Sequence, residues 1–498
     1  MKSFSPIILF IIVLVTLAGC AVGPDFHSQN MATPSLYTAS PLPAQTVSAQ
    51  SDSGAAQRFA FAEELPAQWW TLFGSPDLDM MIKQGIADSP TLELAKAKLR
   101  ELQENRKAQV GALFPSVDAG VSANRQKISG ASLGEPDMDI DPFTLINASI
   151  NVSYTFDIFG GARRQLEALQ AQVEYQQFQL EGAHLTLTAN IVTAAIQEAS
   201  LRAQIRSTLD ILAVQQKQLD VLKTQLELGA VSKTAVLSQE TELAMTKAGL
   251  PPLEKQLDIT RHALSVLIGK FPGDGKIPEF SLDSMHLPES LPVSLPSLLA
   301  HQRPDVRASE ALLHLACAAV GVATANLYPQ ITLSGSYGFQ ATSTDVLFSG
   351  QSVVWNLGAG LVQPIFHGGQ LTAKRRSAIA VYDQAAAQYR QTVLKSFQDV
   401  ADVLRALETD ARTLQAQAQA EAAAKATLAL TEKQFELGAV SYLSLLVAQR
   451  DYQKTLINVI SARAQRYADT AALFQALGGG WWNRKAISAD SPLEKTGI

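Results

Sequence analysis

Cys20 is the residue whose surroundings most clearly predict a chemical modification. It follows a positive charge at Lys2, an apolar run over residues 7–17, and the small residues Ala18 and Gly19. The apolar run is too short to span a bilayer and is typical of an export signal. Small residues that lead into a cysteine resemble a lipobox, where the signal is cleaved and the cysteine thiol is acylated. We therefore predict a signal peptide over residues 1–19 and a lipid on Cys20; an ordinary signal peptide is the alternative.

The other groups that could do chemistry form no catalytic pattern. The seven histidines are scattered, without His-Glu-x-x-His or another paired ligand spacing. Residues 368–370 near Lys374 lack the spacing of a phosphate-binding loop, and no Gly-x-Ser-x-Gly elbow occurs. Cys317 lies in an Ala-rich stretch that favours a small buried hydrophobic side chain over a reactive thiol. The sequence thus indicates no enzyme, no metal and no cofactor besides the lipid, and its net charge of −6 suggests no nucleic-acid partner.

Two parts of the chain are copies of each other. The segment Gln225–Ser232 returns almost unchanged as Gln434–Ser441. Other landmarks recur in the same order: Ser89-Pro90 with Arg303-Pro304, Leu113-Phe114-Pro115 with Leu327-Tyr328-Pro329, and Phe159-Gly160-Gly161 with Phe366-His367-Gly368-Gly369. Such a pattern is that of a tandem duplication. We expect the first repeat over residues 77–269 and the second over residues 303–477.

Each copy contains two segments in which apolar residues alternate with small or polar ones. They cover residues 116–124 and 146–157 in the first copy, and residues 331–340 and 353–361 in the second. A tilted transmembrane strand has about 9–11 residues and the same alternation, apolar toward lipid and polar toward the lumen. A soluble half-buried sheet also alternates. The predicted lipid and the long polar loop over residues 125–145 favour a membrane barrel, and the mature chain shows no apolar run that predicts a spanning helix.

Four strands, in hairpins over residues 116–157 and 331–363, are too few to close a barrel alone. Known barrels of this kind begin at about eight strands, and each unpaired backbone group in lipid costs several kcal/mol. The chain must therefore oligomerise. Two chains would give a barrel filled by its own side chains, whereas three or more leave a channel. The pattern alone leaves both three and four chains open.

A long helical segment is expected after each pair of strands. Residues 161–228 are rich in Ala, Gln, Leu and Glu, and as one helix they would extend roughly 100 Å. Their apolar positions recur at three- and four-residue spacing, which predicts coiled-coil packing on neighbouring helices. Gly229 and Gly438 suit the left-handed conformation that ends a helix, and Ser232 and Ser441 suit capping of the next. We predict two helical hairpins with tips at residues 229–232 and 438–441.

Taken together, the motifs resemble the TolC/OprM outer membrane efflux factors, in their NodT-type lipoprotein branch. The stretches that carry the resemblance are Cys20–Phe26, Trp69-Trp70 with Phe73, Arg303–Ala308, Ala325–Pro329 and Leu477–Trp481. The resemblance implies an α+β membrane protein, a homotrimer whose twelve-stranded outer membrane β-barrel continues into a long α-helical periplasmic barrel. It also implies a passive exit duct for drugs or toxic small molecules. The implied partners are a periplasmic adaptor (membrane fusion) protein and an inner membrane pump of the RND type.

Site residues follow from the resemblance as well. It implies that the adaptor docks at the two tips, through the residues Gly229, Val231, Ser232, Gly438, Val440 and Ser441. It implies a periplasmic gate at Leu443, Val447 and Arg450. Related channels often carry acids at the positions of Ser444 and Val447, and this chain does not. We therefore predict a gate held mainly by apolar contact at Leu443; a plain coiled-coil core leucine is the alternative.

The remaining segments have weaker patterns. The resemblance implies that residues 20–76 and the linker over residues 270–302 wrap the helices as an equatorial collar. It also implies a lipid on Cys20, palmitate included, and outer membrane sorting by Ala21. Within these segments, residues 21–66 and the Pro-rich residues 271–296 look irregular, and neither predicts a good helix. Residues 478–498 are expected to form a tail. The arginines after the strand pairs mark either the membrane interface or a solvated helical turn; they are Arg163, Arg164, Arg375 and Arg376. Other readings remain, namely a helical scaffold or adhesin lipoprotein, and a channel for peptides or proteins through an ABC-type exporter.

Overall fold

The computed structural model describes residues 21–28, 34, 36–135, 137–274 and 276–484. The predicted signal peptide, Cys20 and the end of the predicted tail lie outside these residues. The chain forms two compact units. Unit 1 comprises Met1–Gln29, Lys98–Gln176 and Ser309–Tyr389, and unit 2 comprises Asn30–Ala97, Gln177–Ala308 and Arg390–Ile498.

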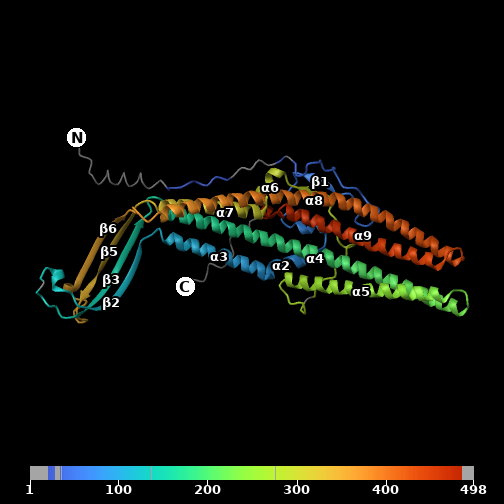
Figure 1. Cartoon of the computed structure of the whole chain (residues 1–498), viewed down its shortest axis with the longest axis horizontal. Helices are drawn as coiled ribbons and strands as arrows, with labels where there is room; N and C mark the ends of the chain where they lie inside the picture. Colours follow the sequence, from blue (N-terminus) through green and yellow to red (C-terminus); the bar gives the residue numbers. More distant parts are fainter. Residues whose placement is uncertain (1–20, 29–33, 35, 136, 275, 485–498) are drawn as a thin grey trace. The chain divides into compact units, whose positions relative to one another are not determined.

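Unit 1 contains the four-stranded antiparallel sheet that the alternation predicts (Figure 1). Its strands are β2 (Ser116–Gln126), β3 (Phe143–Phe156), β5 (Gln330–Ala341) and β6 (Val353–Val362), in the order β2-β3-β5-β6. All four predicted strands are confirmed, and their ends differ from the prediction by at most a few residues. The two copies therefore join edge to edge in one sheet, through the pairing of β3 with β5.

The register of this sheet collects the apolar side chains on one face. Ala119 lies opposite Ile150, Ile150 opposite Tyr337, and Tyr337 opposite Trp355. These cross-strand partners share a face, and Ile150, Tyr337 and Trp355 are 52%, 55% and 73% exposed. A neighbouring row on the other face is polar throughout; it consists of Asp118, Asn151, Ser336 and Asn356. The sheet thus has an exposed apolar face and a polar face, as a wall between lipid and a wet lumen requires.

Two very long helices follow the strand pairs. Helix α4 (Gly161–Glu227) and helix α8 (Gln370–Glu436) have 67 residues each, as the duplication predicts. Each therefore extends roughly 100 Å at a rise of about 1.5 Å per residue. Helices α3 (Pro90–Gly111) and α7 (Pro304–Ala325) are the corresponding helices that precede the strands, with 22 residues each. The repeat is thus preserved at the level of whole elements.

Helix α7 corrects one expectation about membrane spans. Among the described residues, α7 is the helix whose length and apolar composition would allow it to cross a membrane. The sequence prediction that no run would meet this test was therefore wrong. In the structure, 56% of the apolar stretch of α7 is buried inside the protein, as in a core helix. Its Cys317 is 2% exposed, and burial raises the pKa of this thiol, so the predicted small buried hydrophobic role is confirmed.

The chain directly after the predicted lipid site lies against the helices of unit 1. Arg164 is 5% exposed and forms ion pairs with Asp25, at 2.6 Å, and with Glu167, at 2.7 Å. The Cys317 Sγ lies 3.6 Å from the carbonyl oxygen of Pro24. A solvated turn is therefore the wrong description of Arg164, although it fits the exposed Arg375 and Arg376. A buried arginine is stable here because two carboxylates neutralise its charge.

Unit 2 contains the C-terminal parts of α4 and α8 and the helices that follow them. Helix α5 (Lys233–Leu267) follows α4, and helix α9 (Tyr442–Ala476) follows α8, each with 35 residues. Helix α2 (Pro76–Asp88) packs beside a short helix over Trp69–Phe73. The aromatic core includes Trp69, Phe73 and Phe474, whose rings lie 5.7–6.4 Å apart. Each of these three side chains is at most 1% exposed.

Segments that the sequence left irregular form a small sheet in unit 2. Strand β1 (Arg58–Phe61) pairs in parallel with strand β4 (Ser290–Val293). Helix α6 (Pro296–Gln302) follows β4 within the predicted linker. The expectation of irregular structure was therefore wrong at β1 and β4. Each strand has only four residues, and its partner is more than two hundred residues away, so neither segment carries a local strand signal.

The N-terminal segment of unit 2 also contacts both α8 and α9. Arg466 on α9 is 1% exposed, and its guanidinium donates to the carbonyl oxygens of Ser53, at 2.8 Å, and Ala55, at 3.0 Å. On α8, Arg405 donates to the Ser40 hydroxyl at 2.9 Å, and Gln415 donates to a carbonyl oxygen further along the segment. These hydrogen bonds hold the segment across two helices, and the equatorial wrap stays a prediction.

The carboxyl groups of Asp410 on α8 and Asp469 on α9 lie against each other and predict that stability depends on pH. Burial, and then the hydrogen bond and charge of Asp469, raise the pKa of Asp410 to about 7, although Arg466 opposes this. A raised carboxyl pKa means that the folded protein favours the protonated group. Its contribution to stability is therefore complete below about pH 4 and is lost as the pH rises toward 7. We expect Asp410→Asn to flatten the fall in melting temperature between pH 5 and pH 8 by a few degrees.

Thermal denaturation at several pH values measures this difference. Asp402→Asn is the matched control, because Asp402 lies exposed on the same helix. If the melting temperatures of wild type and Asp410→Asn changed equally with pH, the raised pKa of Asp410 would be contradicted.

Candidate functional site

The first helical hairpin turns at Gly229 as predicted. Helix α4 ends at Glu227, and Gly229 has a positive φ of 73°. The amide of Gly229 donates to the carbonyl of Leu226 at 3.0 Å, which satisfies a helix-end acceptor. Helix α5 then begins with the Ser232 hydroxyl accepting from the amide of Ala235 at 3.3 Å. Both local predictions, the left-handed glycine and the serine cap, are confirmed.

The second hairpin repeats this geometry. Gly438 has a φ of 71°, and the amide of Ala439 donates to the carbonyl of Gln434 at 2.8 Å. The Ser441 hydroxyl accepts from the amide of Ser444 at 3.3 Å. Nothing lies within 4 Å of a Cβ built on Gly229 or Gly438. These glycines are therefore needed for the backbone conformation and not for close packing.

Each tip presents one exposed leucine that the sequence analysis did not single out. Leu228 is 79% exposed and Leu437 is 83% exposed, and each directly precedes the turn glycine. Exposed apolar side chains at the same place in both copies are typical of contact surfaces. The signal was present in the sequence, because a leucine just past the last helical turn has no helix neighbour to bury it.

The tips share a small apolar core in unit 2. It contains Leu219 and Leu222 of α4, Val236 of α5, and Leu445 and Leu446 of α9, all buried. The ring of Tyr442 also belongs to this core and meets that of Phe435 edge to face at 5.5 Å between centroids. The two tips are therefore not independent of each other, since one core supports both.

A cavity of about 550 Å³ lies beside the tips. Val221 and Val231 of the first hairpin and Phe435 and Val440 of the second line it, so both hairpins contribute helix and turn residues to its wall. Of the predicted docking residues, Val231, Gly438 and Val440 border this cavity. Gly229, Ser232 and Ser441 lie outside the lining and take part in the turns.

The predicted gate residues lie on the first turns of α9. Leu443 is 67% exposed and Val447 is 49% exposed, so neither is buried by its own chain. Arg450 forms an ion pair with Glu242 of α5, whose side chain is only 7% exposed. Whether Leu443 forms a constriction stays a prediction.

Glu242 is the gate-region acid that the sequence analysis missed. The resemblance pointed to acids only at positions 444 and 447 on α9, whereas this carboxylate comes from α5 in the other hairpin. Two further links join α9 to the first hairpin. The Tyr442 hydroxyl pairs with Gln239, and Gln449 donates to Gln218 at 2.6 Å. Burial and the charge of Glu242 raise the pKa of Tyr442, so its hydroxyl stays protonated and donates.

No group of three or more His, Cys, Asp or Glu side chains within the described residues is arranged to hold a metal. The features that the structure does bring together are two paired tips, a polar network between the hairpins, and a sheet with an apolar outer face. These features are typical of a channel.

Paired helical hairpins joined to a membrane-type sheet define the class of outer membrane export channels. The family model for the outer membrane efflux proteins matches residues 81–270 and 295–479. The chain therefore belongs to this family of outer membrane proteins, and the two matched parts correspond to the two predicted repeats.

Individual relatives agree with this assignment. The pyoverdine export outer membrane protein OpmQ of Pseudomonas aeruginosa is 32% identical over 421 residues, which cover 83% of this chain and 87% of OpmQ. The probable efflux pump outer membrane protein TtgC of Pseudomonas putida is 27% identical over 473 residues, 94% of either chain. The solved outer-membrane channel OprN superposes with a TM-score of 0.84 at 27% identity and covers 93% of this chain and 100% of OprN.

Proposed function

We propose that this protein is the outer membrane exit duct of a tripartite efflux system. A homotrimer receives drugs or toxic small molecules from an inner membrane pump of the RND type, through a periplasmic adaptor protein. The duct itself is passive, and the energy for transport comes from the pump. The observation that carries the proposal is the combination of a sheet with an apolar outer face and two paired, exposed hairpin tips in a chain of the efflux family.

Closure of the sheet supports a trimer. In the order β2-β3-β5-β6, strands β2 and β6 each have a partner on one side only. Unpaired strand edges are not tolerated in lipid, where each free backbone group costs several kcal/mol. Joining β6 of one chain to β2 of the next closes the wall, and three chains give a twelve-stranded barrel that leaves a channel.

The tips support the adaptor as a partner. Leu228 and Leu437 expose apolar side chains on rigid turns, and the cavity beside them has room for side chains of a partner helix. Interfaces of this kind are usually centred on apolar anchors surrounded by polar groups. The charged residues around this cavity, Lys217, Glu432 and Glu436, are suited to the polar part.

The lipid on Cys20 belongs to the proposal. The Arg164 ion pair with Asp25 holds the chain five residues after Cys20 against unit 1, which contains the membrane sheet. A multiply acylated cysteine at this place gives a firm tether, since each buried methylene contributes about 0.8 kcal/mol.

The cargo is proposed to be set by the pump. The description of OpmQ names pyoverdine, whereas that of TtgC names only an efflux pump. Peptide or protein cargo through an ABC-type exporter is the alternative outcome of a transport assay.

Native mass spectrometry of the detergent-extracted outer membrane protein tests the assembly. We expect three chains per particle, with a diacyl or triacyl mass on each N-terminal cysteine. A monomer, or release without detergent, would overturn the channel, and a trimer without added mass would overturn the lipid alone. Deletion of the gene is then expected to sensitise cells to toxic small molecules, and loss of protein secretion without such sensitivity would favour the alternative cargo.

A further inference from the structure

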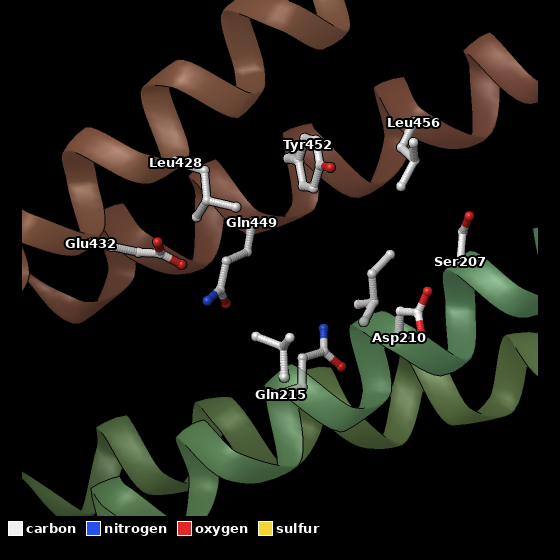
Figure 2. A pocket seen from close by; sticks show the side chains of 10 residues that line it. Ser207, Asp210, Gln215, Leu428, Glu432, Gln449, Tyr452 and Leu456 are labelled. Atoms are coloured by element: carbon white, nitrogen blue, oxygen red, sulfur yellow. The ribbon is translucent and has the colours of Figure 1, made fainter. Parts of the chain in front are cut away.

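A second cavity lies within unit 2, between α4 and the second hairpin (Figure 2). Its volume is about 310 Å³, at the small end of the range for ligand pockets of about 300–1,000 Å³. Glu432 also borders the tip cavity, and Gln449 also belongs to the polar network near the gate, but no role described above fills this space itself. It is therefore a candidate binding site for a small molecule.

The walls of the cavity are mainly apolar. Ile211 and Val214 contribute from α4, Leu428 from α8, and Leu456 from α9. Tyr452 of α9 adds an aromatic ring that is only partly buried (Figure 2). A ligand that fills this cavity must therefore carry a compact apolar body.

Two buried amide oxygens at the cavity have no hydrogen-bond partner. Gln215 reaches in from α4 and Gln449 from α9, so that they approach the gap from opposite walls (Figure 2). Gln215 is 3% exposed, and the Oε1 atoms of both residues are unpaired. The amide nitrogen of Gln449 is already used, because it donates to Gln218 at 2.6 Å. Buried acceptors without partners cost about 1–3 kcal/mol each, so a ligand that donates to them recovers this cost.

The charge of the lining has one sign. Asp210 and Glu432 border the cavity, and no lysine, arginine or histidine is among its lining residues in the described chain. Burial, and then the charge of Glu436, raise the pKa of Glu432. An aromatic face, two carboxylates and two free carbonyl oxygens all favour a positively charged group.

The geometry points to a binding site for an amphipathic organic cation, with a compact apolar body and an ammonium group that donates hydrogen bonds to Gln215, Gln449 and Glu432. A bound cation joins α4 to α8 and α9, next to the turn of α9 that carries Arg450. The site does not depend on the proposed export function, since binding is measured without transport.

Three probes with the same apolar body separate the effect of charge from that of shape in the purified full-length protein. They are 1-aminoadamantane, adamantan-1-ol and adamantane-1-carboxylate, which share one apolar body. Isothermal titration at pH 7 is expected to show saturable binding of the amine and no binding of the carboxylate. The alcohol should bind at least about tenfold more weakly, because it lacks the charge-assisted hydrogen bonds. Equal affinity for the amine and the alcohol would overturn the proposal.

Two variants locate the binding in this cavity. Glu432→Gln is expected to weaken binding of the amine by about tenfold and to leave that of the alcohol unchanged. Gln215→Leu should also weaken the amine, and its helix contacts persist because Gln239 donates to the Gln215 backbone carbonyl, at 2.8 Å. Glu421→Gln removes a carboxylate from α8 away from the cavity and is the matched control. Unchanged amine affinity in Glu432→Gln, with the native mass retained, would show partition into detergent and overturn the site.

Discussion

Cells that carry the double substitution Leu228→Asp and Leu437→Asp are expected to lose efflux completely while the channel still assembles. Both side chains are about four-fifths exposed on turns that their backbones hold without them. The substitution therefore changes little in the folded chain, yet it places a charge at the centre of each proposed contact. Burying an unpaired carboxylate in an interface costs several kcal/mol, enough to reduce adaptor affinity by more than about a hundredfold.

The measurement is the minimum inhibitory concentration of toxic compounds in a strain that lacks the gene and carries each variant. Leu228→Met with Leu437→Met is the matched control, because it keeps the apolar surface and should retain full resistance. Crosslinking of the adaptor is expected to fall in parallel with resistance. Normal resistance in the aspartate variant would show that the tips are not the docking surface.

Removing the ion pair between Arg450 and Glu242 has the second largest expected effect. Glu242 is 7% exposed, so Arg450→Ala leaves a nearly buried carboxylate without its partner. Because Arg450 is itself half exposed, solvent screens part of the cost of the unpaired carboxylate. A cost of about 1.4 kcal/mol to the closed state remains, which corresponds to roughly a tenfold rise in the fraction of open channels. Resting conductance in planar bilayers should rise by this factor.

Two comparisons separate charge from apolar contact at the gate. Glu242→Gln with Arg450→Ala should leak less than Arg450→Ala alone, since the unpaired charge is gone. Leu443→Ala tests the apolar gate directly and should raise leak conductance independently of the ion pair. Wild-type conductance in Leu443→Ala would contradict the apolar gate. Wild-type conductance in Arg450→Ala would show that the ion pair does not hold the gate closed.

Local sequence patterns were sufficient to predict most elements of this fold. The alternation in residues 353–361 predicted β6 because neighbouring side chains on a strand point to opposite faces. The long helices and their turns followed from the scarcity of glycine and proline up to Gly229 and Gly438. In each case the signal and the structure concern residues close together in the chain.

The features that were missed depend on partners far apart in the sequence. Strand β1 forms by pairing with β4, and the buried Arg164 pairs with Asp25, which is distant in the sequence. The pairing of Glu242 with Arg450 joins two hairpins, so that neither residue alone identifies a gate. Such contacts are decided by tertiary packing, which overrides what a single segment suggests.

The pairing of β3 with β5 has a consequence for the order of folding. These strands lie on either side of α4, α5 and α7 in the chain, so their ladder closes a loop of well over a hundred residues. Long-helix formation is local and fast, whereas a contact of such sequence separation carries a high loop-closure entropy. We therefore expect the first helical hairpin to fold and double back in the aqueous periplasm before the two halves of the sheet meet. Entry of the sheet into the lipid bilayer is then expected to follow formation of the helices, as the last step of maturation.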